Sequence, residues 1–104
     1  MSLAMISGHE VHVDDEGFMT EYDEWDEGLG KQLAANVGIE LTDRHLDAIR
    51  FLREDYKTQG ETATLRRVST LGGIPTKELF GLFPKKPAKK MAYIAGLPKP
   101  AGCV

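Results

Sequence analysis

The C-terminal stretch of the chain restricts the fold most, because it suits neither of the two regular secondary structures. Residues 92–104 read AYIAGLPKPAGCV and hold two glycines and two prolines. Proline has no backbone N–H, so it is excluded from helix interiors and from central strands. Gly96 can end a preceding helix in the left-handed conformation, and Pro98 and Pro100 favour extended backbone. We therefore expect residues 96–104 to form a flexible, extended C-terminal arm.

This arm carries the only cysteine of the 104-residue sequence, Cys103, one position before the C-terminus. In polyproline geometry, at about 3.1 Å per residue, the thiol would stand roughly 20 Å from Gly96. Free cysteines are most often buried, but a penultimate residue beside Gly102 has little with which to build a core. The sequence leaves two alternatives open: a thiol presented to another protein, or one folded back on its own surface.

Helix signals divide most of the remaining chain. Asp23 can cap a first helix, with Glu24, Asp26 and Glu27 in its opening turn and residues 36–38 at its end. Thr42 can cap a second, longest helix that ends at Gly60, with His45, Arg50 and Arg53 facing solvent. Further helices are predicted from Thr62 or Thr64 to Gly72, from Pro75 through Leu79, Phe80 and Phe83, and from Pro87 to Ala95.

A small β-hairpin is predicted before the helices. Residues 10–13 alternate polar and apolar side chains, residues 14–17 supply turn residues, and residues 18–20 can return as a second short strand. The fold class is therefore mainly α (α+β): an N-terminal β-hairpin, a compact bundle of about five helices and an extended arm. We expect one domain over residues 1–104, in which residues 1–8 are a purification tag or a disordered start.

Composition excludes several classes of protein. The formal net charge is −3, and no apolar run or leader pattern suits a membrane span or a signal peptide. A single cysteine precludes an internal disulfide and fits a reducing compartment, so we expect a cytoplasmic protein. His9 and His12 lack a third metal ligand nearby, and no phosphate-binding loop is present. We predict neither a metal nor a cofactor.

The charge is divided unevenly between the two halves of the chain. Residues 1–52 have a net charge of −9, whereas residues 53–104 have a net charge of +6. Such asymmetry is typical of a partner-binding surface, although a solvated face is an equally good explanation. Two short helices joined by Gly72 and Gly73 also allow a helix-turn-helix regulator, in which Arg66, Arg67 and Lys77 would face DNA. No base-reading set of residues supports direct nucleic-acid binding.

Several motifs near the C-terminus resemble one known family. Leu82-Phe83-Pro84, Pro87-Ala88-Lys89, the run from Ile94 to Pro100 and the closing Cys103-Val104 are similar to the C-terminal signature of the DsrC/TusE family of sulfur carriers, which includes the gamma subunit of dissimilatory sulfite reductase. Further similarity extends over most of the chain, including Trp25 and residues 49–53.

The resemblance implies a role for Cys103 as the catalytic thiol of a sulfurtransferase-type carrier that has little activity on its own. It would accept persulfide sulfur and pass it on, in tRNA 2-thiouridine synthesis or related sulfur trafficking. The implied partners are a TusBCD/DsrEFH-like donor and a tRNA 2-thiouridylase-like acceptor. The arm residues expected to contact these partners are Gly96, Leu97, Pro98, Lys99, Pro100 and Gly102.

One departure from the family pattern distinguishes two roles. Partners of sulfite reductase carry a second cysteine eleven positions before the penultimate one, where this sequence has Ala92. Their segment corresponding to residues 67–82 is also longer. A single-cysteine, TusE-like carrier is therefore the better match, and a sulfite-reductase gamma-subunit role is the alternative. Positive charge lowers the pKa of a thiol, so the expected thiolate supports are Arg50, Arg53, Lys89 and Lys90.

Overall fold

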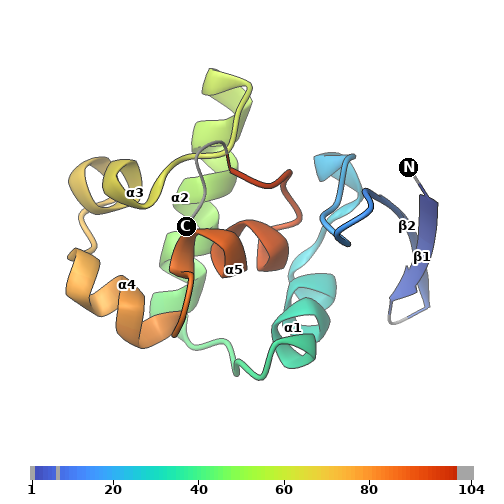
Figure 1. Cartoon of the computed structure of the whole chain (residues 1–104), viewed down its shortest axis with the longest axis horizontal. Coiled ribbons are helices and arrows are strands. Elements are labelled where there is room, and N and C mark those ends of the chain that lie inside the picture. Colours follow the sequence, from blue (N-terminus) through green and yellow to red (C-terminus); the bar gives the residue numbers. More distant parts are fainter. Residues whose placement is uncertain (1, 7, 101–104) are drawn as a thin grey trace.

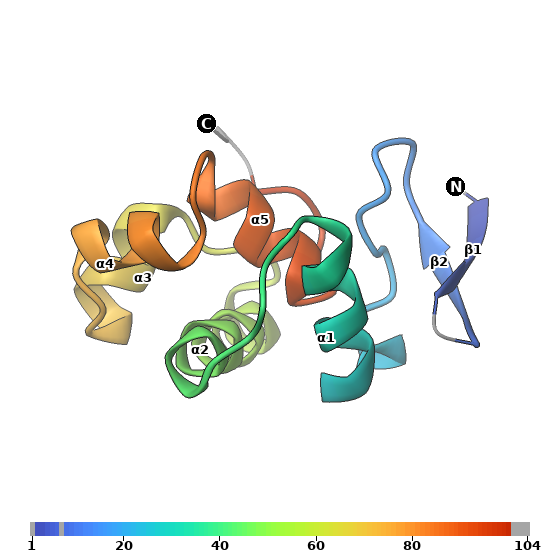
Figure 2. The same ribbon diagram turned by 90° about the horizontal axis from the view of Figure 1, so that it is seen from below.

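The computed structural model describes residues 2–6 and 8–100. Its elements are β1 (Ser2–Ile6), β2 (His9–Val13), a 3-10 helix (Tyr22–Glu24), α1 (Glu27–Asn36), α2 (Asp43–Gln59), α3 (Leu65–Gly72), α4 (Thr76–Leu82) and α5 (Pro87–Ile94). Helices α2 and α5 lie in the middle of the molecule, with the hairpin at one end and α3 and α4 at the other (Figures 1 and 2). The predicted fold class, a hairpin followed by about five helices, is confirmed.

The hairpin is present, and β2 contains the predicted strand at residues 10–13, but its partner is β1 instead of residues 18–20. Strand β2 pairs antiparallel with β1, with Ser2 opposite Val13 and Ile6 opposite His9. The expected return strand over residues 18–20 is reduced to an isolated bridge between Val13 and Met19. Residues 2–6 therefore form a strand rather than a disordered start. Their origin as a tag stays a prediction.

The first helix begins three residues later than predicted. The cap is Asp26, whose Oδ1 accepts the backbone N–H of Leu29 at 2.8 Å. Asp23 instead lies in the 3-10 helix. Glu24, expected in the first turn of the helix, accepts hydrogen bonds from the backbone N–H and the ring Nδ1 of His12, both at 2.9 Å. This carboxylate therefore ties the 3-10 helix to β2.

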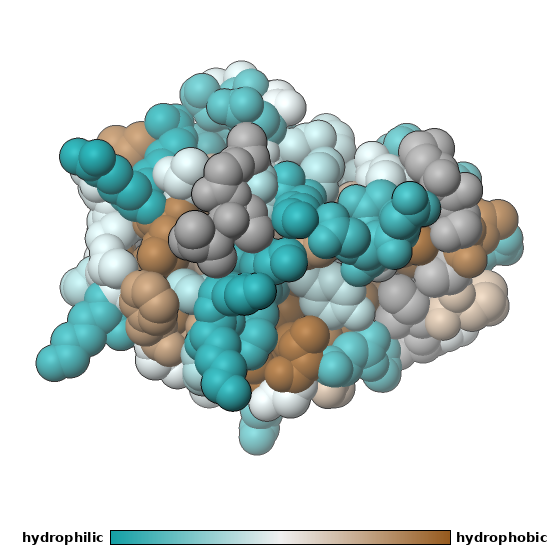
Figure 3. Space-filling view, in the orientation of Figure 1, coloured by the Kyte–Doolittle hydropathy of each residue, from teal (hydrophilic) through white to brown (hydrophobic). Residues whose placement is uncertain are grey.

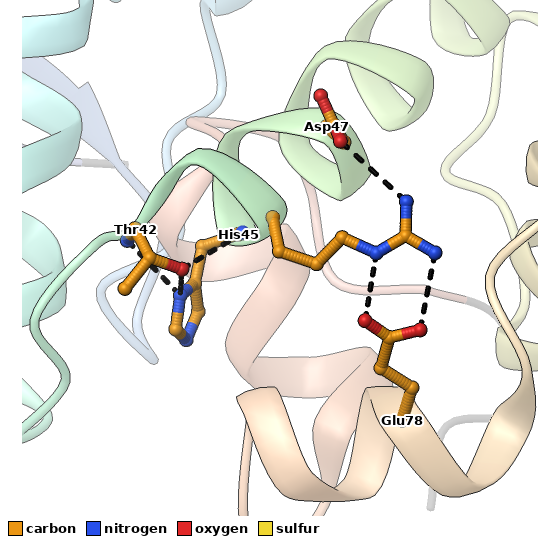
Figure 4. A network of polar contacts seen from close by, with 5 residues as sticks. Thr42, His45, Asp47 and Glu78 are labelled. Carbon is orange, nitrogen blue, oxygen red and sulfur yellow. Dashed lines mark hydrogen bonds and ion pairs between the residues drawn. The ribbon is translucent and has the colours of Figure 1, made fainter.

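The second helix has the predicted ends, at the Thr42 cap and at Gly60 in the left-handed conformation. The prediction that His45 faces solvent is wrong, because this side chain is only 7% exposed. Its Nδ1 accepts the Thr42 backbone N–H at 3.1 Å, and its Nε2 donates to the Leu82 carbonyl at 2.7 Å. Figure 4 shows His45 and Thr42 facing one another, with Glu78 and Asp47 around a neighbouring guanidinium. A buried imidazole with both nitrogens hydrogen-bonded costs little to desolvate.

The three remaining helices follow their local signals closely. Thr64, rather than Thr62, caps α3, Pro75 precedes α4, and Pro87 is the first residue of α5. Two arginine–carboxylate pairs connect these helices to α2. Arg44 donates to Glu78 of α4 through Nε and Nη2, at 2.7 and 3.0 Å. Asp55 of α2 accepts hydrogen bonds from Nε and Nη2 of Arg67 in α3.

The buried side chains form two clusters. The larger lies between α2, α3, α4 and α5 and holds Ile49, Leu52, Phe83 and Met91. The smaller lies between the hairpin and α1. Trp25 and Tyr93 pack against both clusters, so they join the two parts of the core. The C-terminal end of α5 lies at this junction.

Candidate functional site

The candidate site begins where α5 ends. Gly96 has a φ of +71°, in the left-handed region, and the Leu97 N–H donates to the Ala92 carbonyl at 3.0 Å. This is the helix end that the sequence predicted for Gly96. A side chain at this position would be disfavoured for two reasons. The backbone is left-handed, and a Cβ would lie 2.4 Å from Cδ1 of Trp25.

The described part of the predicted arm does not project from Gly96. Leu97 is fully buried in the larger cluster, and Pro100 is also buried. Thr62 Oγ1 donates to the Pro98 carbonyl at 2.7 Å, and Lys99 Nζ lies 3.1 Å from the Glu16 carboxylate. The expectation of a free arm from Gly96 is therefore wrong for residues 97–100. We use the term arm root for residues 95–100 together with the side chains that contact them.

Trp25 and Arg53 hold the first residues of the arm root. Trp25 Nε1 donates to the Ile94 carbonyl at 2.8 Å. Arg53 donates through Nη1 to the Ala95 carbonyl at 2.7 Å and through Nη2 to the Tyr22 carbonyl at 2.8 Å. Its guanidinium lies 4.3 Å from the centre of the Trp25 ring, within range of a cation–π contact. Burial lowers the pKa of Arg53, but an arginine stays charged at neutral pH.

Three of the four predicted thiolate supports, Arg50, Arg53 and Lys90, bind other groups. Arg50 pairs with Glu27 at 3.0 Å, and Arg53 holds the arm root as described. Lys90 Nζ donates to the Pro84 carbonyl at 2.5 Å, and Lys89 lies half-buried in the wall of a surface hollow. Gly102 and Cys103 lie outside the described residues. The support of a thiolate by these side chains stays a prediction.

Sequence reasoning missed most of the arm root. Thr62 was expected as a helix cap, Glu16 as a turn residue, and Trp25 as part of the family resemblance. Each of them contacts the arm over a long sequence separation, 36 residues for Thr62 and 69 for Trp25. The proline pair predicts extended backbone but carries no signal for the surface on which that backbone lies.

One of the three basic residues of the helix-turn-helix alternative, Arg67, is bound to a carboxylate within the protein. Arg67 binds Asp55 with Nε at 2.9 Å and Nη2 at 2.8 Å, and this pairing raises the pKa of Arg67. A guanidinium held in this way is not available for base contacts. Arg66 and Lys77 are exposed. Over residues 2–6 and 8–100, no helix combines the length and the apolar character that a membrane crossing requires.

Comparison with known proteins decides the family. Residues 5–104 match the family described as DsrC like protein. The chain belongs to the DsrC-like family. The predicted DsrC/TusE resemblance is thus confirmed, and the family match includes both the arm root and Cys103.

Curated relatives of this DsrC-like chain carry the name sulfurtransferase TusE. The protein from Salmonella typhimurium (strain LT2) is 38% identical over 109 residues, covering 98% of this chain and 100% of the relative. The protein from Escherichia coli (strain K12) is 35% identical with the same coverage. The match therefore spans both chains almost completely.

Solved structures of DsrC proteins share the fold. Dissimilatory sulfite reductase I (DsrI) superposes with a TM-score of 0.83 at 34% identity, covering 99% of this chain and 100% of that one. Allochromatium vinosum DsrC gives 0.79 at 36% identity, covering 98% and 97%. The oxidised gamma subunit from Archaeoglobus fulgidus gives 0.80 at 32% identity, covering 99% and 100%.

Ala92, the position at which the resemblance implies a second cysteine in sulfite-reductase partners, lies in the core and is fully buried in α5. The sequence holds a single cysteine, so this DsrC-like chain cannot form an intramolecular disulfide.

Proposed function

We propose that this DsrC-like protein is a sulfur-relay carrier whose Cys103 accepts persulfide sulfur and passes it to an acceptor enzyme. The observation that carries the proposal is the family match, which extends through the penultimate residue Cys103, together with relatives named sulfurtransferase TusE at up to 38% identity. The single cysteine fits one-thiol chemistry. We place the protein in the cytoplasm, where thiols stay reduced.

The transfer needs no net oxidant. The Cys103 thiolate attacks the terminal sulfur of a donor persulfide and forms a new S–S bond. The donor S–S bond breaks, and its electron pair leaves with the donor cysteine as a thiolate. Loss of sulfur to the acceptor repeats the exchange in the opposite sense. The thiolate is the reactive form, and a free thiol with a pKa of about 8.5 is mostly protonated at neutral pH.

The arm root restricts how far the thiol can travel. Because Pro100 is packed on the body, only two residues, 101 and 102, separate the anchored chain from Cys103, so the thiol lies three residue steps beyond Pro100. At about 3.6 Å per residue, Cα of Cys103 stays within about 11 Å of Cα of Pro100. We infer that donor and acceptor bind against the body close to the arm root, rather than reaching the thiol at the end of a long tether.

By family likeness the donor is a TusBCD/DsrEFH-like complex and the acceptor is a tRNA 2-thiouridylase. Little autonomous activity is expected, because the sequence offers Cys103 neither a general base nor an oxyanion site. Activation would then occur inside the partner.

Intact-mass measurement after incubation with a persulfidated donor tests the proposal. The full-length protein should gain the mass of one sulfur atom, and a reductant should remove it. Cys103→Ser should gain nothing while keeping the same circular dichroism spectrum. An equal gain by Cys103→Ser, or no gain by the full-length protein, would exclude Cys103 as the carrier.

A second candidate is a partner of dissimilatory sulfite reductase. The structural likeness to DsrC proteins, with TM-scores of 0.79 to 0.83, favours it. The missing second cysteine at Ala92 disfavours it. Stable co-purification with a sirohaem-containing sulfite reductase from the native organism would support this role, whereas co-purification with a tRNA-thiolating enzyme would support the first.

A further inference from the structure

A surface hollow lies beside α5, on the side that faces α1 and the loop after β2. Its volume is about 430 Å³, and its apolar lining comes from Phe18, Val37 and Tyr93. Phe18 and Tyr93 meet edge to face, with ring centres 6.0 Å apart. This volume lies within the range of small ligand and anchor-residue pockets.

The hollow is bordered by four lysines: Lys85, Lys86, Lys89 and Lys90. Among the ion pairs of the described residues, none involves these four side chains. Glu16, the one acid in the lining, is already paired with Lys99. The border therefore carries several positive charges with no carboxylate to balance them. Figure 3 shows hydrophilic side chains beside apolar surface where α5 lies next to α1.

The backbone that presents two of these lysines is strained. Lys85 and Lys86 have φ values of +59° and +50°, in a region that residues other than glycine rarely adopt. Lys86 directly precedes α5 and makes no side-chain capping bond. The Lys86 carbonyl accepts the Lys90 N–H at 3.1 Å, so the backbone of residue 86 begins α5 while its side chain stays free of any capping role. Strain of this kind concentrates at binding and catalytic sites.

We propose that this hollow is a docking site for a partner-protein segment that inserts one apolar anchor side chain between flanking carboxylates. The apolar lining fits the anchor, and the unbalanced lysines fit the carboxylates. The inference goes beyond the proposed sulfur transfer, since it holds whether or not Cys103 carries sulfur.

A nucleic acid fits the same surface less well. Single-stranded nucleic acid needs a basic groove that follows its backbone for several nucleotides. At the edge of this hollow the chain instead presents the acidic turn Asp14-Asp15-Glu16, whose Glu16 belongs to the lining, and this turn is part of the N-terminal half with a net charge of −9. An extended polyanion would be repelled there, whereas a short segment with a central apolar anchor would not.

The test uses the full-length protein, labelled with ¹⁵N, and a fluorescein-labelled peptide in which one phenylalanine lies between two runs of three glutamates. We expect amide shifts confined to residues 16–18, Val37 and residues 85–93, and binding that weakens as salt is added. A peptide with serine in place of phenylalanine should bind at least about tenfold more weakly.

Two variants and a control locate the site. Lys89→Ala combined with Lys86→Gly should weaken binding at least about tenfold, and glycine keeps the left-handed backbone of residue 86. Lys89→Glu alone should do the same without touching that backbone. Lys77→Ala, which removes an exposed lysine on α4, should leave binding unchanged.

Three results would overturn the proposal. The first is equal binding of the phenylalanine and serine peptides, which would show that the apolar lining is unused. The second is a set of amide shifts elsewhere on the protein. The third is displacement of the peptide by a short oligouridylate that binds the same residues more tightly, which would assign the surface to RNA.

Discussion

At the scale of single residues, Gly96 and Trp25 matter most to the account, because the helix end and the arm root meet at them. A Cβ on Gly96 would lie 2.4 to 2.9 Å from three atoms of the Trp25 side chain. The same indole donates to the Ile94 carbonyl and contacts the Arg53 guanidinium. The indole cannot move aside without breaking these contacts. A change at Gly96 should therefore disturb the arm root as a whole.

Gly96→Ala should lower the free energy of unfolding by about 3 kcal/mol, from the left-handed backbone and from the overlap with Trp25. Gly38→Ala is the matched control, since Gly38 has a φ of +74° and open space around it. That variant should lose only about 1 kcal/mol. Urea unfolding followed by circular dichroism measures both. Equal losses would show that Trp25 does not confine Gly96.

A second prediction at this scale concerns how the ionisation of Glu24 makes the stability of the fold depend on pH. The backbone N–H of His12, and then its ring, hold the pKa of the Glu24 carboxyl below its ordinary value. A lowered folded-state pKa stabilises the fold above the unfolded pKa of about 4.3, and this stabilisation is lost as the pH falls through the folded value. A carboxyl-carbon NMR titration should show the low value, and His12→Ala should raise it part of the way, because the backbone donor remains. Titration of Glu24 at its ordinary value in the native protein would contradict this.

At the scale of elements, local rules predicted most helix ends. Thr42, Thr64 and Pro87 mark helix starts, and Gly60 marks an end, because caps and left-handed turns depend on a few neighbouring residues. The start of α1 was misplaced because Asp23 and Asp26 are both good caps, and the choice depends on Glu24 binding His12 twelve residues away. The hairpin partner was missed although its pairing with β2 is local, because residues 2–6 were expected to be a tag or a disordered start.

His45 shows the same limit, since its burial depends on a carbonyl 37 residues away, that of Leu82. His45→Ala should remove the side-chain half of the α2 capping box, in which the His45 ring accepts the Thr42 N–H, together with the bond to Leu82 and the edge-to-face contact with Phe83 at 5.1 Å. The expected loss in unfolding free energy is about 3 kcal/mol. His12→Ala, at a more exposed histidine, should cost about 1 kcal/mol or less. A smaller effect at His45 than at His12 would contradict the assigned role.

At the scale of the whole molecule, the arm root lies at the junction of the two core clusters. Leu97 belongs to the larger cluster, while Lys99 binds Glu16 in the turn after β2. The sequence predicted the extended backbone of the arm and the cysteine at its end. Docking of residues 97–100 could not be predicted, because it needs Thr62, Trp25 and Glu16, which only the fold brings together.

Strand β1 should contribute little to the stability of the whole. Leu3 and Met5 are 54% and 69% exposed, and among the side chains that the structure describes, the strand residues of the smaller cluster come from β2. A chain without residues 1–8 should keep its helical spectrum and a Tm within about 5 °C of the full-length value. Met19→Ala, which empties a buried position in that cluster, should lower Tm by about 10 °C or more. A cooperative loss of helix in the shortened chain would contradict this division.

The central claim is that sulfur is carried at the end of an anchored arm, and tandem mass spectrometry of the loaded protein tests it most directly. After incubation with a persulfidated donor, the added sulfur should map to the terminal fragment that contains Cys103. A chain ending at Gly102 should stay folded and acquire none. Sulfur found on any other fragment, or loading of the shortened chain, would contradict the account.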